Sequence, residues 1–332
     1  MSKRPIELLK AAPLLDIASY ARKGPGRRDQ LSSTEVELLA RTVNRTPEVM
    51  VKVLTRGGQD LRSVRRHLEY LDRKGELDLE TDEGQRLAGK GVERGLLENW
   101  DLDLEEDRRR AALEVRPDRR PPKLVHKVLF SMPPGTPPQK VLDAVKNFAR
   151  EEFGLKHRYA MVLHTDEPHP HVHMVIKAVS EQGERMNIRK ATLRSWRLEF
   201  ARHLRSLGVP ANATERAVRG ENRSPKADGL YRAEQRGQST RAEMHAEQVR
   251  PDPSPDRFRG ERGRKTLVKT RKDVERGWWA AGEILAAQGQ KRLAAKVRSF
   301  VNSMPPIKSD REIDAERPFR QRDVQSREGH TR

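Results

Sequence analysis

The spacing of apolar residues along the chain predicts strands and helices over its middle third. Apolar runs at 49–54, 124–131, 159–164 and 172–176 predict strands. Apolar positions at helical spacing predict helices over residues 61–71, 141–153 and 189–207, and Asp60 is placed to cap the first of them. The predicted order is therefore strand, helix, strand, helix, two strands and a helix.

The last two predicted strands are separated only by a short Pro-rich turn, so they form a hairpin and the sheet is at least partly antiparallel. No strand is followed by a Gly-rich phosphate loop, which argues against a doubly wound parallel sheet. We expect an α+β fold of the split βαβ kind, with a mainly antiparallel sheet and helices on one face.

Changes in composition suggest three regions. Residues 48–210 hold the predicted strands and helices, with a charged insertion at 76–119 that we expect to carry short surface helices. Residues 1–47 are interpreted as a basic N-terminal arm outside the core. Residues 211–332 are interpreted as a basic, partly disordered tail with one amphipathic helix near 272–301.

The charge of the chain points to a polyanionic partner. The sequence has 68 Lys+Arg against 49 Asp+Glu, a formal net charge of +19, and 34% hydrophobic residues. It has no cysteine, which excludes disulfides and thiolate metal sites. It shows neither a signal-peptide pattern nor an apolar run long enough to span a membrane, so we expect a cytoplasmic protein without a membrane span.

The predicted hairpin concentrates histidines. His164 ends its first strand, and His171 and His173 lie on one side of its second strand because alternate residues share a face. The three imidazoles can then converge, with Asp166 and Glu167 close by.

Three neutral imidazoles suit a divalent metal and leave positions open for phosphate oxygens, where the metal would neutralise charge during phosphoryl transfer. His169 has the same parity as His171 and His173, but prolines on both sides place it in the turn. A His-rich turn without a metal is the alternative.

The histidine pattern resembles a known family. His171-Val172-His173 resembles the His-hydrophobic-His motif of the HUH endonucleases. The whole stretch 164–173 resembles the third motif of conjugative relaxases of the mobilisation (MobP/MobA) type, close to the T-DNA border nuclease. That family often has Asn where this chain has His169, and a further Asn where it has Lys177.

Two further motifs resemble the same family, and the resemblance covers about residues 49–208. Residues 68–75, Leu-Glu-Tyr-Leu-Asp-Arg-Lys-Gly, are similar to its first motif, which implies that Tyr70 is the nucleophile. Residues 130–132 are similar to its second motif, which implies that Ser131 contacts DNA near the nick. Asp166 or Glu167 would orient a ligand histidine or accept the tyrosine proton.

Other residues complete this hypothesis. Among the four tyrosines Tyr20 is the rival of Tyr70, since it also precedes a basic Gly-containing turn, whereas Tyr159 belongs to a predicted strand and Tyr231 to the tail. Arg189 and Lys190 open the last predicted helix and are candidates for phosphate contacts. An ordinary solvated helix face is the alternative for these two.

The resemblance implies an enzyme. It would be a DNA relaxase that uses Mg²⁺ or Mn²⁺ at His164, His171 and His173 to nick an origin of transfer, hold the 5′ end on a tyrosine, pilot the strand and rejoin it. Its implied partners are single-stranded origin DNA, auxiliary relaxosome proteins and the coupling protein of a type IV secretion channel. The alternatives are a rolling-circle replication initiator and a non-catalytic basic protein that binds DNA or RNA.

Overall fold

The structure, a computed structural model, describes residues 16–21, 29–54, 58–115, 122–221 and 263–308. The chain divides into two compact units, each with an apolar core of its own. One unit contains Asn44–Thr214, which corresponds to the region expected at residues 48–210. The other combines Leu15–Val43 with the chain that follows Glu215.

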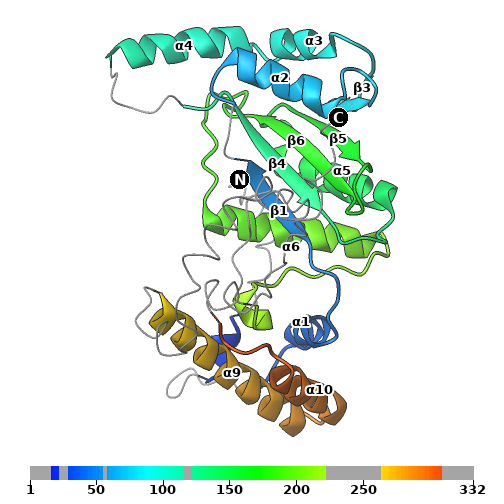
Figure 1. The fold of residues 1–332 in the computed structure, drawn as a ribbon, viewed down its shortest axis with the longest axis vertical. Helices are drawn as coiled ribbons and strands as arrows, with labels where there is room; N and C mark the ends of the chain where they lie inside the picture. Colours follow the sequence, from blue (N-terminus) through cyan, green and yellow to red (C-terminus); the bar gives the residue numbers. More distant parts are fainter. Residues whose placement is uncertain (1–15, 22–28, 55–57, 116–121, 222–262, 309–332) are drawn as a thin grey trace, which may run out of the picture. The chain divides into compact units, whose positions relative to one another are not determined.

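A six-stranded antiparallel sheet forms the centre of the first unit (Figure 1). Its strands, in spatial order, are β1 (Met50–Leu54), β4 (Val125–Ser131), β6 (His171–Lys177), β5 (Tyr159–His164), β2 (Leu79–Thr81) and β3 (Arg86–Leu87). The four predicted strands and the hairpin of β5 and β6 are all present. The α+β class with a mainly antiparallel sheet is therefore confirmed.

Helices cover both faces of this sheet, which corrects the expectation that they cover one. They are α2 (Leu61–Leu71), α3 (Val92–Asn99), α4 (Leu102–Val115), α5 (Pro138–Phe153) and α6 (Lys190–Ser206). Helices α5 and α6 pack on the face that carries Val128 and Phe130, whereas α2 and α3 pack on the face that carries Val125 and Val175. The central strands are apolar at both odd and even positions, so each face needs a cover.

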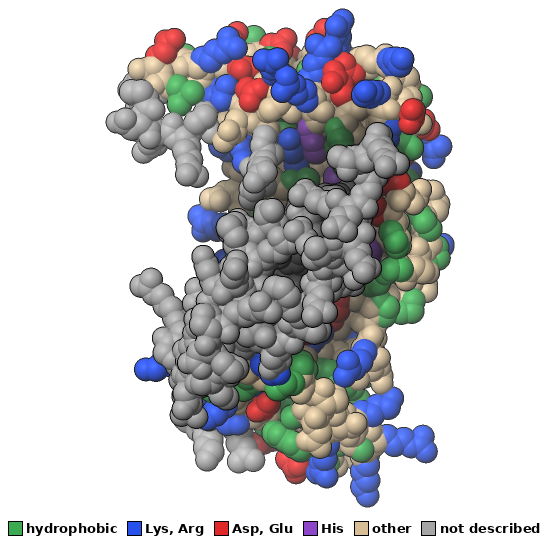
Figure 2. All heavy atoms as spheres, in the orientation of Figure 1, with side chains coloured by type: hydrophobic (Ala, Val, Ile, Leu, Met, Phe, Trp, Pro, Cys, Tyr) green, Lys and Arg blue, Asp and Glu red, His purple; other side chains and the backbone are tan. Residues whose placement is uncertain are grey.

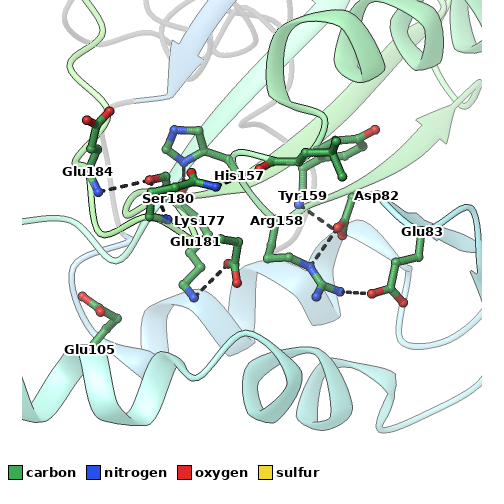
Figure 3. Close-up of polar contacts among 12 residues, drawn as sticks. Asp82, Glu83, Glu105, His157, Arg158, Tyr159, Lys177, Ser180, Glu181 and Glu184 are labelled. Atoms are coloured by element: carbon green, nitrogen blue, oxygen red, sulfur yellow. Dashed lines mark hydrogen bonds and ion pairs between the residues drawn. The ribbon is translucent and has the colours of Figure 1, made fainter.

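Within the charged segment expected at 76–119, the described residues 76–115 contribute to the sheet and the core and are not only a surface insertion. Strand β2 pairs with β5, and β3 extends the edge. Leu79 and Trp100 are buried in the core beneath α2. Arg158, next to β5, binds Asp82 (Nε to Oδ2, 2.8 Å) and Glu83 (Nη2 to Oε1, 2.9 Å) of the β2–β3 turn (Figure 3). Strands of two and three residues are too short to produce a readable apolar pattern.

The second unit is helical and includes part of the region expected to be a separate arm. Its elements are η1 (Ile17–Ala21), α1 (Ser33–Val43), η2 (Ala217–Arg219), α9 (Arg264–Ala287) and α10 (Lys291–Asn302). Ile17 and Leu39 are buried against α9 and α10, so residues of the expected arm are core residues here. The helix predicted at 272–301 is two helices, because Gly289 adopts a φ of 80° between them. Residues 222–262 and 309–332 of the expected tail lie outside the described residues.

None of the helices that the structure describes combines the length and the apolarity that a membrane crossing requires.

Candidate active site

The three predicted metal ligands lie together on the face of the sheet that α2 covers. His164 at the end of β5 pairs in register with His171 at the start of β6, and His173 follows on the same side of β6. The ring centroids are 5.3 Å apart for His164 and His171, 4.8 Å for His164 and His173, and 5.2 Å for His171 and His173. One nitrogen from each ring lies within 4.8 Å of the other two. The hairpin therefore brings these side chains into one cluster.

Hydrogen bonds orient two of these rings. His164 Nε2 donates to the carbonyl of Leu71 at 2.8 Å, and His171 Nδ1 donates to the carbonyl of His169 at 2.9 Å. A carbonyl only accepts, so these nitrogens carry the protons and the opposite nitrogens keep their lone pairs. His173 Nδ1 is buried and has no hydrogen-bond partner in the described part of the chain. Oriented lone pairs and a buried nitrogen without a partner fit a metal ion held by three imidazoles.

The surroundings favour the neutral form of two of these histidines, His164 and His173. Burial lowers the pKa of His173 to about 3, and the neighbouring His164, His171, His67 and Arg73 act in the same direction. Burial also lowers the pKa of His164, although its bond to the Leu71 carbonyl opposes this shift. Neutral imidazole is the form that binds a metal, so the cluster suits a divalent cation without a competing proton.

Helix α2 places Tyr70 next to the cluster. Asp60 caps the helix by accepting a hydrogen bond from Ser63 N at 2.8 Å, as the sequence predicted. Leu68 and Leu71 are buried against the sheet, which turns Tyr70 to the other side with 52% of its surface exposed. Its phenol is thus accessible to a large substrate. Histidine side chains are visible at the surface beside α2 (Figure 2).

Two side chains flank the ring of Tyr70. His67 stacks with it at 6.3 Å between centroids and also meets the ring of His173 edge-on at 6.3 Å. One imidazole ring therefore separates Tyr70 from the cluster. On the other side, the Arg73 guanidinium lies 5.0 Å from the centroid of the Tyr70 ring. In the sequence His67 precedes Tyr70 by three residues, but this spacing alone assigns it no role.

Sequence reasoning missed Arg73, which lies in the turn that ends α2. Arg73 and Lys74 have positive φ angles of 53° and 59°, and Gly75 has a φ of 90°. This turn directs Arg73 to the carboxylate of Asp166, with which it forms an ion pair. The only signal in the sequence was a cation three residues after a tyrosine, which is too common to decide anything.

The two acidic candidates occupy different positions. Burial opposes ionisation of Asp166, but the Arg73 guanidinium, a backbone hydrogen bond and the nearby histidines together outweigh it and lower the pKa of that carboxyl. Asp166 therefore links the hairpin to Arg73, and neither it nor the exposed Glu167 belongs to the histidine cluster. Their catalytic roles stay predictions.

The predicted DNA contacts differ in their placement. Ser131 lies on β4 and pairs in register with His171 of β6, on the same face of the sheet. Its exposed fraction is 4%. Arg189 and Lys190 are exposed at the start of α6, which packs on the opposite face of the sheet. No hydrogen bond or ion pair of the described chain joins them to the histidines. The structure brings Ser131 to the site and leaves the two cations apart from it.

The other residues that the sequence analysis considered lie outside the histidine cluster, and those described in the structure contact other parts of the protein. Tyr20 is 6% exposed in the other unit, and its hydroxyl donates to Glu35 Oε1 at 3.1 Å. Tyr159 is buried in β5, and burial raises its pKa to about 12. Lys177 is nearly buried and donates to Glu181 at 3.3 Å, at the far end of β6 from the cluster (Figure 3). His169 contributes only its carbonyl, and Tyr231 lies outside the described residues.

Comparison with known proteins gives a family similarity for the region that contains the histidine cluster. Residues 80–206 match the family described as Relaxase, MobA/VirD2-like, nuclease domain. Over these residues, which make up less than half of the chain, the protein is similar to a relaxase nuclease domain of the MobA/VirD2 type. The matched residues contain all three histidines of the cluster, whereas Tyr70 and Arg73 precede them.

The chain also resembles curated proteins. The T-DNA border endonucleases VirD2 of Agrobacterium fabrum and of Rhizobium radiobacter are each 26% identical to the chain, over 215 and 226 residues. These alignments cover 58% and 59% of this chain and 45% and 49% of the relatives. VirD2 of Rhizobium rhizogenes is 26% identical over 226 residues, which is 61% of this chain and 47% of that protein. The chain spans about half the length of the curated relatives it matches.

Proposed function

We propose that this protein is a site- and strand-specific DNA relaxase that nicks an origin of transfer through Tyr70. One contact between the helix of Tyr70 and the histidine cluster carries the proposal. Leu71, the residue after Tyr70, accepts a hydrogen bond from His164 through its backbone carbonyl. The exposed Tyr70 and the three clustered histidines would therefore act on the same substrate.

The reaction is a phosphoryl transfer to tyrosine. The Tyr70 oxygen attacks the scissile phosphorus, the bond from phosphorus to the 3′ oxygen breaks, and the departing 3′ oxygen takes up a proton as a hydroxyl. The phenol proton passes to a base. The product is a 5′-phosphotyrosyl strand, which the reverse attack by the 3′-OH rejoins without an external energy source. His164, His171 and His173 would hold Mg²⁺ or Mn²⁺, which polarises the phosphate and neutralises its developing charge.

The neighbours of Tyr70 suit this reaction. The Arg73 guanidinium beside the ring contributes positive charge where a DNA phosphate must approach. Asp166 holds Arg73 in place through its ion pair. Ser131, which pairs with His171 in the sheet, would contact DNA close to the nick.

The wider role follows from the resemblance. The relatives are T-DNA border endonucleases by name, and we propose for this chain an origin of transfer in conjugative mobilisation, with auxiliary relaxosome proteins and a type IV coupling protein as partners. A rolling-circle initiator would need a tyrosine downstream of the histidines, and the one tyrosine that follows His173 in the sequence is Tyr231, which lies outside the predicted nuclease region. A non-catalytic binding protein would require neither neutral histidines nor an exposed Tyr70.

The test is cleavage of single-stranded origin oligonucleotides of the host plasmid with Mg²⁺ or Mn²⁺, followed by denaturing electrophoresis for covalent protein–DNA adducts. We expect the wild-type chain to form an adduct and Y70F to form none. Y159F is the matched control, because Tyr159 is buried in the same unit, and it should still form the adduct. An adduct with Y70F would refute the assignment of the nucleophile, and the absence of metal-dependent cleavage in the wild-type chain would refute the function.

A further inference from the structure

Helix α9 of the second unit has two faces of opposite character. One face is buried, and its residues are Arg271, Val274, Gly277, Trp278, Ala281, Gly282 and Leu285. The other face is exposed. At spacings of four and three residues it carries Lys265, Lys269, Lys272, Arg276 and Trp279, which we call the α9 stripe. Such spacings place these side chains in one row along the helix. The row extends about 21 Å at about 1.5 Å per residue.

The charge of the α9 stripe is largely uncompensated. Lys265, Lys269 and Lys272 make no ion pair with any residue in the ranges that the structure describes, and Arg276 pairs with Asp273 beside the row. Lys and Arg side chains project from the surface of this unit in Figure 2. A row of cations without acidic partners attracts a chain of negative charges, and the repeated spacing suits a polymer with regular phosphates.

Trp279 adds a feature that charge alone does not explain. Its neighbour Trp278 is fully buried, donates to the Val218 carbonyl at 2.8 Å and packs against Phe300. Trp279 is 40% exposed at the end of the lysine row. Trp278 is the tryptophan that packs in the core of this unit, whereas Trp279 does not fill that core position. An accessible aromatic ring in line with cations is the combination that binds single-stranded nucleic acid, because bases stack on the ring while phosphates meet the cations.

We propose that the α9 stripe is a second binding site for single-stranded DNA, with phosphates on Lys265, Lys269 and Lys272 and a base stacked on Trp279. The site lies in a different unit from the histidine cluster and requires no cleavage. It therefore goes beyond the nuclease reaction and gives the second unit a function in holding a strand without sequence preference.

The experiment titrates the full chain, in the presence of a chelator, with an oligothymidylate of about 20 nucleotides. Tryptophan fluorescence reports stacking, and fluorescence anisotropy of a labelled oligonucleotide reports affinity. We expect quenching in the wild-type chain and loss of that quenching in W279L. We expect K269Q/K272Q to weaken binding about tenfold at low salt and to reduce the slope of log K against log salt by about 1.4.

The matched control is K291Q/R292Q, which removes two exposed charges from α10 of the same unit. It should leave both quenching and the salt slope unchanged. Equal weakening by the two pairs, quenching that persists in W279L, or tighter binding of a duplex of the same length would each overturn the proposal. Adduct formation at Tyr70 is measured separately on K269Q/K272Q. A result against DNA binding at the α9 stripe can thus be distinguished from a result against the proposed nuclease function.

Discussion

The imidazole Nε2 of His164 donates a hydrogen bond to the backbone carbonyl of Leu71 at 2.8 Å, although 93 residues separate the two in sequence. The carbonyl belongs to the last turn of α2, where helical carbonyls lack partners within the helix. One bond thus satisfies a helix end, fixes the tautomer of a candidate ligand and sets the position of Tyr70 relative to the histidines.

Metal binding should depend on the clustered histidines and not on the one in the turn. We predict that H173N weakens Mn²⁺ binding, measured by isothermal titration calorimetry, by at least about tenfold, because it removes one of three ligands. H169N is the control, since the His169 side chain is exposed and outside the cluster. Equal affinities of H173N and wild type would show that the cluster is not the metal site.

Arg73 should contribute to the rate. We predict that R73Q lowers the single-turnover nicking rate about 10- to 100-fold, or about 1.4–2.7 kcal/mol of transition-state stabilisation. R73K retains the charge without the planar guanidinium, so it should recover part of the rate. A rate for R73Q equal to that of wild type would show that Arg73 does not contribute to nicking.

Gly75 should be required for the turn that carries Arg73. It has a φ of 90°, and a Cβ there would lie 2.5 Å from the backbone carbon of Gly89. We predict that G75A lowers the free energy of unfolding, measured by urea denaturation, by about 2–3 kcal/mol. G84A has a similar φ of 79° with nothing near its Cβ, so it should cost only about 1 kcal/mol. Equal losses would mean that the close approach to Gly89 does not matter.

Stability should fall in mild acid. Burial lowers the pKa of His126 from 6.5 to about 4, with Lys123 and Arg185 acting in the same direction. The unfolded chain therefore binds more protons than the folded one between these values. The stabilisation is complete above pH 6.5 and is lost as the pH falls toward about 4.

Urea unfolding of wild type and H126Q across this range measures the effect. H126Q should reduce the dependence of the unfolding free energy on pH by up to about one proton. The other histidines with lowered pKa values leave a residual dependence in both proteins. Identical pH profiles would show that His126 is not buried in its neutral form.

The sequence predicted the parts of the site that a strong local pattern encodes. The hairpin placed His164, His171 and His173 together because alternation and a short turn determine which side chains share a face. The cap at Asp60 and the apolar row of α2 were readable for the same reason.

Features that depend on tertiary packing were not readable. Arg73 reaches Asp166 only because an irregular turn follows α2. The short strands β2 and β3 gain their hydrogen bonds from β5 and have no pattern of their own. Residues 33–43 looked like part of an arm because their partners, α9 and α10, lie more than two hundred residues later in the chain.

The most direct test of the account is to identify the covalently linked peptide. The chain is incubated with single-stranded origin oligonucleotide and metal, digested with protease and nuclease, and examined by mass spectrometry for a tyrosine that carries a nucleotide phosphate. We predict a single modified peptide containing Tyr70. A nucleotide phosphate on Tyr20, Tyr159 or Tyr231, with Tyr70 unmodified, would contradict it.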